Sequence, residues 1–121
     1  MTVLDPDRFI DEAIDEGRKS GLAALGNLAG LVFVISEAEV SCDMDGIDSF
    51  IDQYGSTGLS QLCAAFHAIG AESIAVSCRT VLESMPNPSE PDLDRLNSLI
   101  SERAGYDYES LRGMVTREAS S

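Results

Sequence analysis

The sequence predicts an all-α fold, a compact single-domain bundle of about six helices around a central apolar helix at about residues 22–40. Apolar residues recur at three- and four-residue spacings along most of the chain. No alternating strand pattern of useful length occurs, and there is no internal repeat or long linker. With 121 residues, 44% of them hydrophobic, the chain fits one domain over residues 1–121.

The N-terminal third predicts two helices. Asp5 and Pro6 form an N-cap and first-turn pair, and a helix follows to about Lys19. A second helix, at about residues 22–40, is apolar almost all round until Glu37, so we expect it at the centre of the core. Glycines recur here with two GxxxG spacings, which predict close approach of another helix: Gly17, Gly21, Gly26 and Gly30.

The middle of the chain predicts a turn and two further helices. The polar residues 41–46 read as the turn, and a short helix over about 47–53 follows it. Glycines in the segment 55–58 are expected to break that helix. Apolar residues at helical spacing then predict a longer helix over about 59–69, which Gly70 ends.

The C-terminal part predicts three helices and one loop. A helix over about 72–85 runs into the proline-rich loop at 85–91. Ser89 can cap the next helix, and the acid three residues later completes a variant of the capping box. That helix is expected to end near Arg103, and a last, weaker helix is expected over 106–117.

The composition argues against some classes of binding partner and favours one cellular compartment. The net charge of −13 argues against binding of nucleic-acid phosphates and against docking on an anionic membrane. The longest apolar stretch, Leu22–Ile35, is shorter than the ~20 residues that a membrane-spanning helix needs. No signal peptide is visible, and three cysteines without a CxxC motif favour reduced thiols and a cytoplasmic location.

The charge is uneven along the sequence. No Lys or Arg occurs from Ser20 to Cys78, and most acids of that span fall between residues 37 and 52. Such a cluster is either a solvated face that maintains solubility or a binding face for a basic partner. Carboxylates on adjacent helical turns, about 5–6 Å apart at Cβ, can imitate a phosphate track. The candidate partner-binding residues are Glu37, Glu39, Asp43, Asp45, Asp48 and Asp52.

Metal and catalytic chemistry receive little support. Asp43-Met44-Asp45-Gly46 resembles part of an EF-hand loop, but position one would be Ser41 and position twelve Asp52 instead of Glu. The cysteines and the one histidine lack paired zinc-ligand spacing. Cys63 and His67 share a helical face, yet a dyad within one helix lacks an oxyanion hole and a third partner. We therefore predict no catalytic residues, no metal ligands and no cofactor.

Part of the chain resembles a known family. The resemblance covers about residues 35–85 and rests on three runs: Glu37-Ala-Glu39-Val40, Asp45-Gly46-Ile47-Asp48-Ser49-Phe50-Ile51-Asp52-Gln53-Tyr54-Gly55 and Ala68-Ile69-Gly70-Ala71-Glu72. These runs resemble a bacterial family of small acidic helical domains of unknown function, which includes a DNA-mimic protein. In that family an Asn-Gly-Gly-Phe turn stands where this chain has Met44-Asp45-Gly46-Ile47. The structural motif residues are Gly46, Phe50 and Gly70.

Three functions remain open at this point. The resemblance implies an all-helical, non-enzymatic domain that binds a basic DNA-binding protein such as a transcriptional regulator, and it leaves a homodimer open. The second reading is a small metal-binding (Ca²⁺ or Mg²⁺) or enzymatic domain that uses the carboxylates around residues 41–52. The third is an antidote or regulatory subunit, which shares the physics of the first and differs only in its partner.

Overall fold

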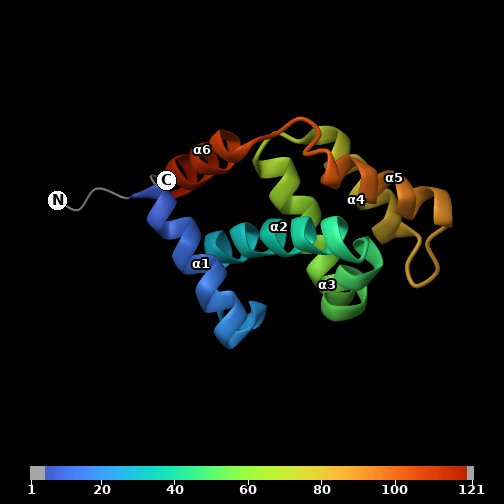
Figure 1. The fold of residues 1–121 in the computed structure, drawn as a ribbon, viewed down its shortest axis with the longest axis horizontal. Coiled ribbons are helices and arrows are strands. Elements are labelled where there is room, and N and C mark those ends of the chain that lie inside the picture. The colour runs from blue at the N-terminus through green and yellow to red at the C-terminus, as the bar shows by residue number, and fades with distance from the viewer. Residues whose placement is uncertain (1–4, 120–121) are drawn as a thin grey trace.

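Helices make up the fold of residues 5–119, the part of the chain that the computed structural model describes (Figure 1). No strand occurs in this part, which confirms the predicted all-α class. The elements follow one another as α1 Pro6–Ser20, the 3₁₀ helix η1 Leu22–Ala24, α2 Asn27–Met44, α3 Ile47–Ala68, α4 Glu72–Glu83, α5 Glu90–Ser101 and α6 Tyr108–Ala119.

The central element is α2, which packs against α1, α3, α5 and α6. Four consecutive residues, Val32 to Ile35, are almost wholly buried, so neighbours cover this helix on every side. The predicted central apolar helix is therefore confirmed, although its bounds differ. A break at Leu25–Gly26 separates η1 from α2, because Gly26 takes an extended backbone conformation as the N-cap.

The predicted turn at 41–46 is wrong over most of its length. Helix α2 continues to Met44, and only Asp45 and Gly46 turn the chain into α3. The extension has a tertiary cause, since the Cys42 side chain is buried in the core and its carbonyl accepts a hydrogen bond from Ser101 Oγ. Packing against α5 thus overrides the polar composition of this segment.

Helix α3 contains one kink. Gly55 has a φ of 66° and a ψ of −163°, a conformation that glycine adopts without the steric cost of a Cβ. The predicted break over 55–58 is thus confirmed in place but is confined to one residue. The kink divides α3 into a first arm, 47–54, and a second arm, 56–68.

The ends of the described chain lie side by side, since α6 packs along α1 (Figure 1). Polar contacts join the two helices. Asp7 Oδ1 accepts a hydrogen bond of 2.9 Å from Tyr108 Oη and lies 2.9 Å from Arg112 Nε. The predicted caps are also present, because Asp5 accepts from the Asp7 N–H and Ser89 from the Asp92 N–H.

Close helix approach depends on Gly17. A Cβ atom there would lie only 2.3 Å from Cδ1 of the buried Phe33 ring, so α1 and α2 could not pack as they do with any larger residue. The approach predicted from the GxxxG spacings is confirmed at Gly17. It is wrong at Gly21 and Gly26, where nothing lies within 4 Å of such an atom.

Candidate acidic interface

The six predicted partner-binding carboxylates lie around the junction of α2 and α3. Three of them belong to α2, Asp45 stands in the turn, and Asp48 and Asp52 are on the first arm of α3. They divide into two sets by what they touch. Glu37, Glu39 and Asp43 contact other parts of the chain, which we call the tethered acids. Asp45, Asp48 and Asp52 are the open acids.

Two of the tethered acids accept hydrogen bonds from tyrosines. Tyr54 Oη donates to Glu37 Oε1 at 2.8 Å, and Tyr106 Oη donates to Glu39 Oε2 at 2.6 Å. Burial raises the pKa of both phenols, and the hydrogen bonds to the glutamates raise the pKa values further. Both tyrosines therefore remain protonated donors at neutral pH, and the two glutamates have structural partners.

Arg103 supplies the cation that the sequence of this region lacks. Its guanidinium binds both carboxylate oxygens of Asp43, at 3.0 and 2.9 Å, and its Nε lies 3.3 Å from Glu39 Oε2. The hydrogen bond from Arg103 lowers the pKa of Asp43. The span without basic residues in the sequence is thus partly neutralised in space by the segment after α5.

The open acids have different surroundings. Asp45, Asp48 and Asp52 are all exposed, and no ion pair with any of them occurs within residues 5–119. Asp48 and Asp52 stand four residues apart, so they project from one face of the first arm of α3. Their charges are therefore available to a cation from outside the domain.

Asp48 and Asp52 also line a groove of about 360 Å³ between α3 and the α4–α5 loop. Apolar side chains share this groove with the two carboxylates, namely Ile51, Met85 and Leu93. The proline-rich loop forms the opposite wall with Pro86, Asn87 and Pro88. A lysine or arginine side chain would complement this lining. Its aliphatic stem can cover the apolar atoms of the groove while its charged head meets a carboxylate.

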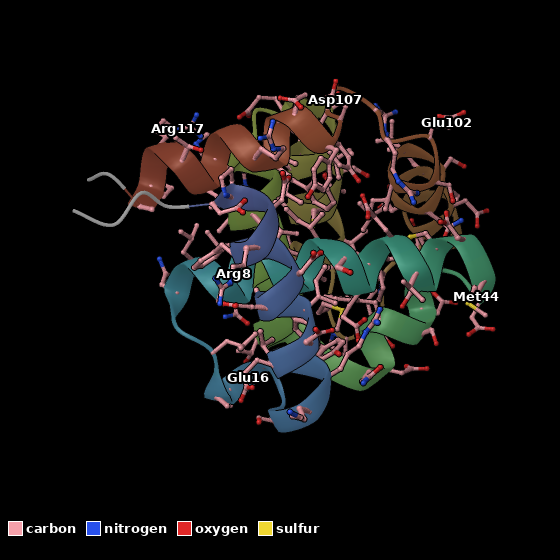
Figure 2. The ribbon with its side chains drawn as sticks, turned by 60° about the vertical axis from the view of Figure 1, so that its left-hand side comes forward. Arg8, Glu16, Met44, Glu102, Asp107 and Arg117 are labelled. Atoms are coloured by element: carbon pink, nitrogen blue, oxygen red, sulfur yellow. The ribbon has the colours of Figure 1, made fainter. Side chains whose placement is uncertain are left out.

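Two exposed apolar side chains adjoin the acids on α2. Val40 is 41% exposed and Met44 is 76% exposed, and their four-residue spacing places them on one face of the helix. Figure 2 shows Met44 at the end of α2 that is farther from α1. The sequence does not predict this exposed pair, because an apolar helix gives no sign of which residues its neighbours leave uncovered.

The structural motif residues lie at the two ends of α3 and in its first arm. Gly46, with a φ of 103°, is the N-cap of α3. Phe50 is fully buried and stacks on the Tyr54 ring, with centroids 4.9 Å apart. Gly70, with a φ of 83°, follows the C-cap of α3 and turns the chain toward α4. These residues shape the α2–α3–α4 connections and carry no chemistry of their own.

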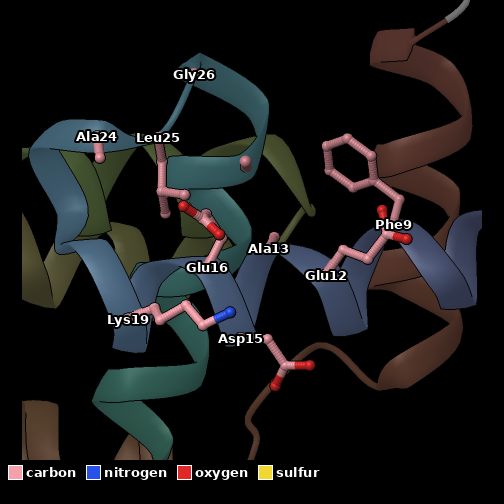
Figure 3. A pocket seen from close by; sticks show the side chains of 10 residues that line it. Phe9, Glu12, Ala13, Asp15, Glu16, Lys19, Ala24, Leu25 and Gly26 are labelled. Carbon is pink, nitrogen blue, oxygen red and sulfur yellow. The ribbon is translucent and has the colours of Figure 1, made fainter.

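A second groove, about 520 Å³, lies away from all six predicted acids. It is an open groove between α1 and the segment that joins η1 to α2 (Figure 3). Phe9, Ala13 and Leu25 give it apolar walls, while Glu12 and Glu16 stand at its edge. Arg8 contacts Glu12 at 2.9 Å, and Ser20 Oγ donates to Glu16. This groove could not be predicted from the sequence, because it depends on the unpredicted break before α2.

The described geometry also bears on the metal-binding and catalytic alternatives. Within residues 5–119, no group of three or more His, Cys, Asp or Glu side chains is placed to hold a metal ion. His67 Nδ1 lies 2.6 Å from Glu72 Oε1 at the surface, whereas Cys63 is buried.

None of the described helices has the length and apolar character to cross a membrane. Comparison with protein-family models, curated proteins and solved structures found no match to this chain.

Proposed function

We propose that this chain is a non-enzymatic, cytoplasmic interaction domain that binds the basic surface of a DNA-binding protein, as a DNA mimic does. The observation that carries the proposal is the division of the six acids. Three have partners within the chain, whereas Asp45, Asp48 and Asp52 are exposed without a described cation. Exposed charges of one sign favour fast association with a surface of the opposite sign.

The groove beside Asp48 and Asp52 supports a partner with Arg or Lys side chains. Its apolar residues match the aliphatic part of such a side chain, and its carboxylates match the charge. The exposed apolar pair Val40 and Met44 adds a small water-excluding contact at the end of α2 that precedes Asp45. An interface of this kind combines apolar contact with charge complementarity, as protein–protein interfaces commonly do.

A binding assay with matched charge variants tests the proposal. The probe is a fluorescent Arg- and Lys-rich peptide, measured by anisotropy against the full chain. Replacing the open acids in the triple variant D45N/D48N/D52N should weaken binding at least tenfold. The control D11N/D15N/D94N removes the same charge from exposed acids on α1 and α5, and it should retain most of the affinity.

Two further measurements make the test decisive. Binding of the unaltered chain should weaken steeply as ionic strength rises from low to moderate salt. The chain should also displace a labelled DNA duplex from a basic DNA-binding domain. Equal losses in the two triple variants would show that only the total charge matters, and the acidic face would then be a solubility feature.

A further inference from the structure

The open groove of about 520 Å³ runs along helix α1, and we call it the α1 groove. One wall is a single face of α1, because the lining residues of that helix recur at three- and four-residue spacings: Phe9, Glu12, Ala13, Glu16 and Lys19. From Phe9 to Lys19 this wall is about 15 Å long, at a rise of about 1.5 Å per residue. The segment that joins η1 to α2 forms the other wall (Figure 3).

Small residues make up much of the lining of the α1 groove. They come from α1, from η1 and from the start of α2, and they are Ala13, Ala24, Gly26 and Ala29. Nothing lies within 4 Å of a Cβ atom built at Gly26, so the groove is open down to the backbone at that point. Small side chains let a packed helix approach closely, at interaxial distances of about 8–10 Å. The lining can therefore admit a further helix beside α1.

Phe9 and Leu25 supply the large apolar side chains of the α1 groove. Both are half-buried, and in Figure 3 they stand on either side of Ala13. Leu25 takes no part in the core cluster of the described residues, so the fold leaves this leucine between the core and the solvent. An apolar side chain of a binding partner would complete its burial, which favours binding through the apolar area removed from water.

The charges along the α1 groove are mostly negative. Glu12, Asp15 and Glu16 line it together with one cation, Lys19, and all four side chains are exposed. Arg8 pairs with Glu12, but no ion pair to Asp15 or Glu16 occurs within residues 5–119. A cationic side chain of a partner can therefore meet two carboxylates while its aliphatic stem covers the apolar lining.

We propose that the α1 groove binds a short amphipathic helix of another protein, whose apolar stripe packs on Phe9 and Leu25 and whose basic side chains meet Asp15 and Glu16. Because the groove is open, a small molecule would leave much of its surface in water, whereas a helix can follow α1 for about three turns. Docking of an amphipathic helix in an apolar groove is a recurring mode of recognition. The site does not rest on the function proposed above, because none of the six acids of that interface lines it.

NMR chemical-shift mapping on the full chain tests the proposal. The probe is a synthetic peptide of about 14 residues, with Leu at three- and four-residue spacing and Lys on both flanks of the Leu stripe. When it is added to isotope-labelled protein at about 0.15 M salt, the amide signals of the groove should shift, namely those of Ala13, Ala24, Leu25, Gly26 and Ala29. A peptide of the same composition in scrambled order, which has no apolar stripe, should bind roughly tenfold more weakly.

Two adjacent alanines of η1 provide a matched pair of variants. Both are exposed, but Ala24 lines the α1 groove, whereas Ala23 lines a different groove beside α3. The added ring in Ala24→Phe would occupy the α1 groove, so this variant should bind the amphipathic peptide roughly tenfold more weakly. Ala23→Phe and D45N/D48N/D52N should both keep the affinity within about threefold at this salt concentration. Circular dichroism checks that each variant is folded, and the mapping of the unaltered chain depends on none of them.

Several results would overturn the proposal. One is the absence of shifts at these amides with about 1 mM peptide, and another is an equal loss of affinity in the two alanine variants. Shifts that follow protein concentration without peptide would assign the groove to a second copy of the chain. Loss of binding in D45N/D48N/D52N alone would place the peptide on the acidic interface. The Arg- and Lys-rich peptide that tests that interface has no apolar stripe, so each of the two proposals can fail without the other.

Discussion

Replacement of Gly17 should disturb the packing of α1 against α2. Its missing Cβ leaves room for the Phe33 ring, which is buried and cannot move aside without disturbing α2. We expect Gly17→Ala to lower the free energy of unfolding by about 1–3 kcal/mol, the usual cost of overpacking a core. Chemical denaturation followed by circular dichroism measures this change.

Gly113 is the matched control for that experiment. It also lies in a helix, α6, but a Cβ there meets open space. Because alanine is the better helix former, Gly113→Ala should raise stability by roughly 0.5–1 kcal/mol. Opposite signs for two identical substitutions would isolate the contact with Phe33. A loss of similar size at both positions would contradict the packing argument.

The contact between Asp43 and Arg103 has a definite pH signature. The guanidinium lowers the pKa of the Asp43 carboxyl below its unfolded value of about 3.9. The contact therefore favours the folded state above about pH 4, and its contribution is lost as the pH falls through the folded-state pKa. An NMR titration of Asp43 should give a lowered pKa that rises toward 3.9 in Arg103→Gln.

A second arginine serves as the comparison. Arg95→Gln on α5 removes the same charge, but none of the described contacts joins Arg95 to Asp43. The Asp43 titration should change little in that variant. A shift of equal size in both variants would mean that the pKa depends on the total charge of the domain and not on the bidentate contact.

At the scale of elements, α3 depends on a cap from another helix. Its N-cap is Gly46, which has no side chain, and the Ile47 N–H instead donates to Asn97 Oδ1 of α5 at 2.8 Å. Asn97→Ala leaves that partly buried N–H without its partner. We expect a loss of about 1–2 kcal/mol and faster amide hydrogen exchange in the first turn of α3.

Asn87 offers the corresponding control in the α4–α5 loop. It is exposed, and only its backbone N–H makes a described hydrogen bond, to the Ser84 carbonyl. Asn87→Ala should therefore change stability by less than about 0.5 kcal/mol and leave exchange in α3 unaltered. If Asn97→Ala behaved in the same way, the cap would have no energetic role.

The elements also show how far the sequence could predict this fold. The local sequence was enough to predict features that have a local cause, such as the Asp5 cap and the Gly55 kink. The local sequence did not predict helix ends that depend on tertiary packing. The end of α2 is polar in sequence, yet Cys42 is drawn into the core, so the helix continues. The break before α2 was hidden because its flanking residues are apolar.

The candidate acidic interface also combines features that the local sequence predicts with features that depend on tertiary contacts. The concentration of acids could be read along the chain, whereas their partners could not. Arg103 is sixty positions from Asp43 in the sequence. Arg103 itself lies in the turn after α5 and has a left-handed backbone conformation, with a φ of 53°. Tyr106 approaches Glu39 from still farther along the chain. Charge counted over a linear window therefore overestimated how many of the carboxylates are open.

At the scale of the whole molecule, the net charge of −13 acts against folding. Like charges are closer together in the compact state than in the unfolded chain, so their repulsion lowers stability at low ionic strength. Salt screens this repulsion over about 10 Å at 0.1 M. We expect the thermal midpoint to rise as sodium chloride is added from low to moderate concentration, measured by scanning calorimetry.

The two triple variants distinguish this general effect from a specific interface. Each removes three exposed carboxylates, so both should raise the midpoint at low salt, by similar amounts, and both gains should shrink when salt is added. Stability would thus respond to the number of charges, whereas binding of a basic peptide would respond to their position. A midpoint that does not change with salt in the unaltered chain would mean that the tethered acids and their partners already offset the repulsion.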